Sequence, residues 1–336
     1  MIISDASLFL LAIVAAAIIS AGLTAAIRPL LLKHALAKPN ARSSHRIPTP
    51  QGAGIAVIAA TLLVTVAIMA DASHVNIPIA VFGATLFIAI VGFADDLKSI
   101  PVLARLLLQG VAVGAIVFTA PDDLRIISAC PLWIERGLIL LAGLWFVNLV
   151  NFMDGLDWMT VAEIVPVTSA LVVLGSLGDF PLSPALVAAA LCGAMIGFAP
   201  FNRPVATIFL GDVGSLPIGL LVGWCLLQLG SHHHLSAALL LPLYYLADAS
   251  VTLMRRVLRR EPFWAAHRSH FYQRATDNGF TVWRVVSEVF VLNVVLAALA
   301  IASTRTASFA IEAVLILLGG AAVAFSMYRF SQPRSV

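Results

Sequence analysis

The chain alternates between long apolar runs and short polar connectors along its whole length. The runs have the roughly 17–25 residues that a helix needs to cross a bilayer, and they lack the short alternating pattern of barrel strands. We therefore expect an all-α polytopic membrane protein in which residues 1–336 form one integral-membrane domain. The pattern predicts eleven transmembrane helices, at residues 6–32, 53–70, 77–94, 102–120, 133–150, 158–176, 183–199, 214–230, 235–257, 282–303 and 308–329.

Composition supports this fold class. The 336 residues are 61% hydrophobic and only 11% charged, whereas soluble domains average about 25% charged residues. The first run has no basic segment before it, so we interpret it as a retained span rather than a signal peptide. Cys130, Cys192 and Cys225 have no paired spacing, which argues against a disulfide framework or a structural metal. No feature suggests a nucleic-acid partner.

Basic residues predict the orientation of the spans. If the connector at 33–52 is cytoplasmic and the spans alternate, all of the 20 Lys and Arg residues except Arg125, Arg136 and Arg305 fall on the cytoplasmic side. The N-terminus is then periplasmic and the C-terminus cytoplasmic. A miscounted span would scramble this asymmetry, so the asymmetry also supports the number of spans.

Every cluster of polar residues that could take part in binding or catalysis falls on this same cytoplasmic side. A transporter usually places such groups near the midplane in broken helices, so the one-sided distribution indicates an enzyme at the membrane surface. The outer connectors hold short polar segments, and we interpret the histidine tract among them as solvated. The cytoplasmic clusters lie at residues 39–46, 95–98, 148–157, 202–203, 211–215 and 267–273.

Two adjacent carboxylates, Asp95 and Asp96, follow an apolar run. A carboxylate at the centre of a membrane helix costs roughly 2.5–3.5 kcal/mol, and two like charges repel unless a cation lies between them. Together with Asp212 they are candidates to hold Mg²⁺, which one or two carboxylates bind together with substrate phosphates. The alternative is that a carboxylate at a helix end only faces water.

Two further clusters carry binding chemistry. The segment Gly211-Asp212-Val213-Gly214-Ser215 precedes a helix, where backbone N–H groups favour phosphate, although Asp212 or Ser215 could equally be an ordinary helix cap. Asn148, Asn151, Asp154 and Asp157 recur every third residue, which predicts one polar stripe on a helix suited to a nucleobase or sugar edge.

His267 and His270 lie near a basic cluster at residues 255–260. Imidazoles and guanidinium groups suit a pyrophosphate better than a metal here. The alternative for the basic cluster is a polybasic segment that attracts anionic lipid.

Together these residues resemble the polyprenyl-phosphate N-acetylhexosamine-1-phosphate transferases of the glycosyltransferase family 4 type. The motifs are Asp95-Asp96, the run Asn148, Asn151, Asp154 and Gly155, the segment Gly211 to Ser215, and His267-Arg268-Ser269-His270. The opening segment, Pro39 to Pro50, is most similar to the O-antigen-initiating branch.

The chain departs from the family pattern at three places. Ser99 replaces a third acidic residue, Trp158 replaces a glycine after Asp157, and Gln51 stands where an arginine is usual. No core carboxylate is lost, so the departures concern the choice of sugar more than the type of reaction.

The resemblance implies transfer of a sugar-1-phosphate from a UDP-N-acetyl amino sugar to undecaprenyl phosphate at the bacterial inner membrane, with release of UMP. It implies Mg²⁺, with Mn²⁺ as a substitute, held by Asp212, Asp95, Asp96 and Asn151. Asp95, Asp96, Asp212, His267 and His270 are then the catalytic candidates. The substrate-binding candidates are Asn148, Asn151, Asp154, Asp157, Lys98, Arg268, Gly214 and Ser215.

The competing interpretations are a transporter, with Asp248 as the charged residue near mid-span, and a lipid phosphatase. The amino sugar, a direct attack or an aspartyl intermediate, and the pathway, O-antigen or a related envelope polysaccharide, all stay open. So does the oligomeric state, for which a homodimer is the family's precedent.

Overall fold

The computed structural model describes residues 4–37, 48–72, 75–262 and 267–334, and within them it contains thirteen helices and one small sheet. The opening segment at 38–47, on which the similarity to the O-antigen branch depends, lies outside the described residues. Nine of the described helices are long and apolar enough to cross a membrane. They are α1 (Asp5–His34), α2 (Gly54–Asp71), α3 (Ile79–Leu97), α4 (Val102–Thr119), α5 (Leu132–Met153), α6 (Met159–Ser176), α8 (Asp212–Ser231), α12 (Val282–Thr304) and α13 (Phe309–Ser331).

Two more spans complete the predicted set. Helix α7 (Leu182–Phe198) is a slightly shorter apolar helix at the seventh expected position. The expected span at 235–257 is divided into α9 (Leu235–Leu240) and α10 (Leu243–Leu258), with Pro242 between them. Proline lacks a backbone N–H and clashes with the preceding turn, which explains the break. The all-α polytopic fold is confirmed, with one of its expected spans in two pieces.

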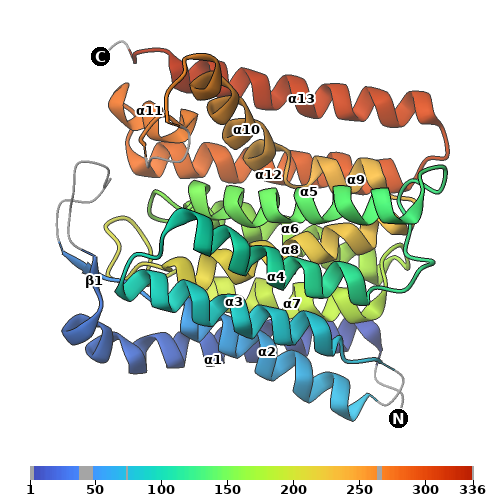
Figure 1. Cartoon of the computed structure of the whole chain (residues 1–336), viewed down its shortest axis with the longest axis horizontal. Helices are drawn as coiled ribbons and strands as arrows, with labels where there is room; N and C mark the ends of the chain where they lie inside the picture. The colour runs from blue at the N-terminus through green and yellow to red at the C-terminus, as the bar shows by residue number, and fades with distance from the viewer. Residues whose placement is uncertain (1–3, 38–47, 73–74, 263–266, 335–336) are drawn as a thin grey trace.

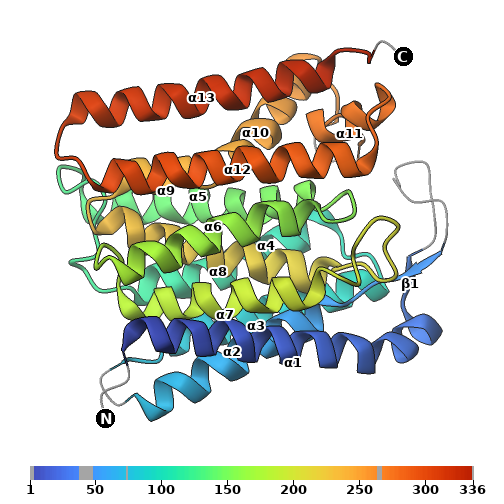
Figure 2. The ribbon, with the colours of Figure 1, turned by 180° about the vertical axis from the view of Figure 1, so that it is seen from behind.

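The helices form a bundle with α7 and α8 inside it. Helix α7 packs against α1, α2 and α6, and α8, the most buried of the nine long helices, packs against α3 and α5. Helix α13 is the least buried and lies beside α12 at the edge of the bundle (Figures 1 and 2). On α4, Leu103, Leu107 and Val111 form an exposed apolar stripe, as expected for a helix that faces lipid.

Most of the irregular structure gathers at one end of the bundle. The strands β1 (Leu36–Ala37) and β2 (Thr49–Pro50) pair antiparallel there, and the short helix α11 (Phe271–Asp277) lies at the same end of the bundle, on the other side (Figure 1). The N-terminus lies at the opposite end. Termini at opposite ends fit an odd number of crossings, and which end faces the cytoplasm stays a prediction.

Glycines bring three helices into close contact at this end. A Cβ on Gly54 would lie 2.2 Å from the Cα of Gly214, and a Cβ on Gly92 would lie 2.3 Å from the carbonyl oxygen of Asp212. Helices α2 and α3 can approach the first turn of α8 this closely only because these positions have no side chain. The contact places the carboxylates of α3 beside the beginning of α8.

Candidate active site

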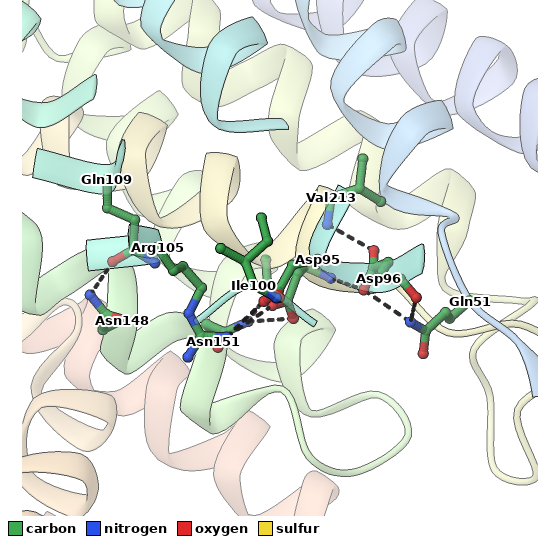
Figure 3. Close-up of polar contacts among 11 residues, drawn as sticks. Gln51, Asp95, Asp96, Ile100, Arg105, Gln109, Asn148, Asn151 and Val213 are labelled. Atoms are coloured by element: carbon green, nitrogen blue, oxygen red, sulfur yellow. Dashed lines mark hydrogen bonds and ion pairs between the residues drawn. The ribbon is translucent and has the colours of Figure 1, made fainter. Parts of the chain in front are cut away.

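Asp96 caps helix α8 from a neighbouring helix. Its Oδ1 accepts the backbone N–H of Asp212 at 2.9 Å, and its Oδ2 accepts that of Val213 at 3.1 Å (Figure 3). Gly211 has φ +78°, and a Cβ there would lie 2.5 Å from Asp96 Oδ2. The first N–H groups of a helix have no partner within the helix, and a carboxylate there also suits the helix dipole. Asp96 thus fixes where α8, and with it Asp212, begins.

A third contact to Asp96 comes from Gln51, the residue that follows strand β2. The side chain Nε2 of Gln51 donates to Asp96 Oδ1 at 3.0 Å and to the Asp96 carbonyl at 3.3 Å. Gln51 is itself fixed, because its backbone pairs with Phe209 and with Ala35. Both oxygens of Asp96 therefore have donors from the protein.

Asp95 and Asp212 share one guanidinium group. Arg105 Nη1 on α4 lies 2.7 Å from Asp95 Oδ2 and 3.7 Å from Asp212 Oδ2. The backbone N–H of Ile100 also donates to Asp95, at 2.6 Å. The sequence pattern assigns Arg105 only to the basic face of the membrane. Its position one turn into an apolar run was the available signal, because a guanidinium at such a depth needs an anionic partner.

The amides of α5 connect this cluster to the bundle interior. Asn151 Nδ2 donates to Asp212 Oδ1 at 2.8 Å and to Ser215 Oγ at 2.9 Å. One turn earlier, Asn148 Nδ2 donates to Gln109 Oε1 at 2.7 Å (Figure 3). The two asparagines therefore lie on one face of α5, as their spacing predicts.

The prediction that Asp154 and Asp157 continue this stripe on the same helix is wrong. Helix α5 ends at Met153, so Asp154 and Asp157 lie beyond it. A Cβ on Gly155 would lie 2.2 Å from the hydroxyl of Tyr272, so the chain turns away where α11 packs against it. The backbone N–H of Ala206 donates to Asp157 Oδ2 at 2.9 Å, which directs this carboxylate toward the connector before α8.

Asp154 is a half-buried residue just beyond the end of α5. Its surroundings raise the pKa of its carboxyl from 3.8 to about 7: burial and the nearby charges of Asp96 and Asp157 raise it, and a hydrogen bond from Thr160 Oγ1 opposes them. A carboxyl in this position is partly protonated near neutral pH.

The two histidines meet in the loop before α11. Their rings are stacked with centroids 5.0 Å apart, and His267 Nδ1 contacts Ser269 Oγ at 2.8 Å. Burial, followed by the nearby charges of His270 and Arg256, lowers the pKa of His267 to about 4 against the opposing effect of Asp248, so His267 is neutral at pH 7. Arg268 forms an ion pair with Asp277, at 3.2 Å.

A cavity of about 500 Å³ joins these parts. Its polar walls come from α4, α5, α8 and the histidine loop, and its remaining walls are almost wholly apolar. The polar lining residues are Arg105, Asn148, Asn151, Asp212, His267 and His270. The apolar lining residues are Val102, Leu106, Leu141, Leu144, Trp145, Phe152 and Leu253.

Not every predicted site residue lines this cavity. Gly214 and Ser215 belong to the first turn of α8, where Gly214 packs on α2 and Ser215 contacts Asn151. Lys98 is exposed at the end of α3. Of the predicted residues, only Asn148, Asn151, Asp212, His267 and His270 line the cavity.

The side chains of the site can hold a divalent metal without forming a complete protein cage. Among the residues that the structure describes, no three His, Cys, Asp or Glu side chains converge as a protein cage would require. Mg²⁺ needs no such cage, because one or two carboxylates suffice when substrate phosphates and water complete its shell. Asp212 and Asp95 are two carboxylates gathered around a single positive group, and they fit this mode of binding.

Known proteins have sequences similar to part of this chain. The model of glycosyl transferase family 4 matches residues 78–230, a range that includes Asp95, Asp96 and Asp212 together with Asn148 and Asn151. Phospho-N-acetylmuramoyl-pentapeptide-transferase of Mycobacterium sp. (strain JLS) is 29% identical, over 64% of this chain and 75% of that protein.

Two other relatives with the same name match over shorter stretches. The protein of Mycobacterium tuberculosis (strain ATCC 25177 / H37Ra) is 30% identical over 46% of this chain and 49% of its own length. That of Limosilactobacillus fermentum (strain NBRC 3956 / LMG 18251) is 28% identical over 51% and 53%. With nine long apolar helices in the described residues, the chain is a multi-span membrane protein, and its residues 78–230 are similar to glycosyl transferase family 4.

Proposed function

We propose that this chain transfers a sugar-1-phosphate from a UDP-N-acetyl amino sugar to undecaprenyl phosphate. The acceptor's phosphate oxygen attacks the β-phosphorus of the nucleotide sugar. A new P–O bond forms, the bond between the β-phosphorus and the bridging oxygen breaks, and UMP leaves with that oxygen. The product is a lipid-linked sugar pyrophosphate. The relatives named for transfer of phospho-N-acetylmuramoyl-pentapeptide support this type of reaction.

One observation carries the proposal: the lining of the cavity combines charged and polar side chains with a set of apolar ones. An isoprenoid phosphate has the same two-part chemistry. Leu106, Leu141 and Leu253 suit the hydrocarbon chain, while Arg105 and His270 suit the phosphate. A lipid acceptor can therefore place its phosphate beside Asp212 while its chain stays in an apolar environment.

Arg105 has the central electrostatic role in this proposal. The reaction brings an anionic phosphate to an anionic diphosphate, and their repulsion opposes contact. A guanidinium group can hold two phosphate oxygens at once, and it remains charged at all relevant pH values. When substrate phosphates enter, Arg105 can exchange a carboxylate partner for a phosphate without leaving the site.

Mg²⁺ is the proposed cofactor, with Mn²⁺ as a substitute. Asp212 and Asp95 would hold the ion, and Asn151 would orient Asp212 through the hydrogen bond at 2.8 Å. The bound ion supplies neutralisation of the charge on the phosphate oxygens. Asp96 supports the ion only indirectly, because both its oxygens already accept hydrogen bonds within the protein.

Asp95 is the proposed base for the lipid phosphate. The second pKa of a phosphate monoester lies near 6, so only a small fraction needs to lose a proton at pH 7. The ion pair with Arg105 holds the Asp95 carboxylate beside the cavity. A direct attack requires nothing further from Asp95, whereas an aspartyl intermediate would require it to contact the β-phosphorus.

The setting of the reaction follows the same reasoning. We place the cavity at the cytoplasmic face of a bacterial inner membrane, because the basic connectors and the histidine loop lie at this end. Initiation of O-antigen or a related envelope polysaccharide is the proposed pathway. It rests on the sequence motifs, whereas the named relatives use a muramoyl-pentapeptide substrate.

The test is release of UMP by the purified protein with undecaprenyl phosphate, Mg²⁺ and a panel of UDP-amino sugars. We expect UMP and a lipid-linked sugar pyrophosphate in equal amounts from one preferred sugar. Release of inorganic phosphate from the lipid, without UMP, would instead identify a lipid phosphatase. Absence of both products in a folded sample would contradict an enzymatic role for the cavity.

A further inference from the structure

Asp248 is a buried carboxylate for which the proposed reaction has no use. It lies on α10 with 0% of its surface exposed, below the loop that carries the two histidines. A transporter would place such a group in a substrate path. The hydrogen bonds of Asp248 show instead that it binds the beginning of α11.

Five donors converge on this carboxylate. Two come from α10 itself, namely the hydroxyls of Tyr244 at 3.3 Å and Thr252 at 3.2 Å. The other three come from the beginning of α11: His270 Nδ1 at 3.1 Å, Phe271 N at 3.0 Å and Tyr272 N at 3.2 Å. A carboxylate has about four lone-pair positions. Its acceptor capacity is therefore fully used, so Asp248 serves neither as a metal ligand nor as a base.

Asp248 fixes the beginning of α11 from outside that helix. His270 is the N-cap residue of α11, but its side chain makes no capping hydrogen bond. The free N–H groups of Phe271 and Tyr272 are satisfied by Asp248 instead. At the other side, the hydroxyl of Tyr272 donates to the carbonyl of Phe152 at 3.0 Å, so α11 is also attached to the end of α5.

The same carboxylate determines how the His270 ring is presented. A carboxylate only accepts hydrogen bonds, so His270 Nδ1 carries the proton and Nε2 is the nitrogen left for the cavity that the ring lines. The ring is also held between His267 and Tyr272, with centroid distances of 5.0 and 5.7 Å. Its orientation is thus set by Asp248 and Tyr272, which do not line the cavity, together with His267, which does.

We propose that Asp248 is a positioning residue that acts through His270. It holds Nε2 of the His270 ring toward the cavity in which the acceptor's phosphate is proposed to bind. This inference rests on the proposed function wherever turnover is the readout. It differs from a purely structural role because it predicts that the effect of Asp248 on turnover depends on the presence of His270.

The test compares Asp248→Asn, His270→Ala and the double variant in the UMP assay. Asparagine keeps the size of aspartate but has an N–H₂ donor in place of one acceptor oxygen and carries no charge. The group that binds His270 and the first N–H groups of α11 is therefore weakened. We expect kcat to fall about 10- to 100-fold, the usual range when a group that orients a site residue is changed, while KM for the nucleotide sugar stays within about threefold. In the His270→Ala background the same change should lower kcat by less than about threefold, because coupled residues are not additive.

Glu163→Gln is the matched control. Glu163 is also buried, at 2% exposure, but it contacts Asn293 rather than α11. It should retain the wild-type kcat. Asp248→Ser, which removes the carboxylate, serves as a second variant if Asp248→Asn does not fold. A wild-type kcat in a folded Asp248 variant, or losses that multiply in the double variant, would overturn the proposal.

Hydrogen exchange of the peptide 267–277 separates this proposal from the proposed function. Faster exchange there in the Asp248 variant, and not in Glu163→Gln, supports the anchor even if the wild-type protein releases no UMP. In that case the proposed function fails and the positioning role stands on exchange alone. Unchanged exchange in the Asp248 variant would overturn it.

Discussion

At the scale of single residues, the three carboxylates of the site have different surroundings and therefore different uses. Asp96 is occupied by the N-terminus of α8, Asp95 is paired with Arg105, and Asp212 contacts both Arg105 and Asn151. The sequence identifies these acidic residues because a carboxylate beside an apolar span is costly and usually marks a functional site. It does not divide their roles, because each role depends on a partner from another helix.

Arg105 provides the first prediction at this scale. Arg105→Gln should lower kcat/KM by about 10²-fold or more, because the site then holds two carboxylates without their shared cation and lacks a donor for phosphate. Arg105→Lys should recover part of the loss, since it restores the charge without the planar fork. Arg284→Gln is the control, because Arg284 pairs with Glu288 on α12 away from the cavity. Equal activity of Arg105→Gln and the control would contradict the assignment.

Asp154 gives a prediction about pH. Because burial raises its pKa from 3.8 to about 7, the folded protein keeps a proton that the unfolded chain has lost between these values. This contribution to stability is fully present below about pH 3.8, is lost as the pH rises from there to about 7, and changes little above that. Thermal unfolding in detergent should therefore show the midpoint of the wild-type protein falling between about pH 4 and about pH 7 relative to Asp154→Asn. Parallel curves for the two proteins would contradict the buried carboxyl.

At the scale of elements, the site depends on where helices begin and end. Hydropathy alone locates the spans, because lipid requires long apolar helices. It does not locate the break at Pro242, which lies within an apolar run, nor the end of α5 at Met153. The cap of α8 by Asp96 joins residues 116 positions apart. Such a contact is set by tertiary packing, so local sequence could propose only Asp212 or Ser215 as the cap.

The contact between α3 and α8 can be tested with two glycines of the same helix. In Gly92→Ala the new Cβ would lie 2.3 Å from the carbonyl oxygen of Asp212, so α8 must shift. We expect a loss of about 1–3 kcal/mol of stability, as for other overpacked sites, together with most of the activity. Gly83→Ala places a Cβ where no atom lies within 4 Å and should be neutral or slightly stabilising. Chemical denaturation of both variants makes the comparison, and equal stabilities would contradict the close packing.

At the scale of the whole molecule, one end of the bundle carries the chemistry. The connector before α2, the ends of α3 and α5, the beginning of α8 and the loop before α11 come together there, although they are distant in sequence (Figures 1 and 3). Their gathering on one face follows from the alternation of spans, which the sequence predicts. The two-part cavity does not follow from it, because Arg105 and the apolar wall of α4, α5 and α10 meet only in the folded bundle.

The most direct test of the account is lipid-dependent UMP release by Asp212→Asn, measured beside the wild-type protein and Asp157→Asn. Asp212 lines the cavity and contacts Arg105 and Asn151, whereas Asp157 is directed toward Ala206. We expect Asp212→Asn to insert and fold normally but to lose turnover by about 10³-fold or more, as when an essential charge is removed from a transition state. We expect Asp157→Asn to retain most of its activity. Normal turnover in Asp212→Asn would contradict the proposed site.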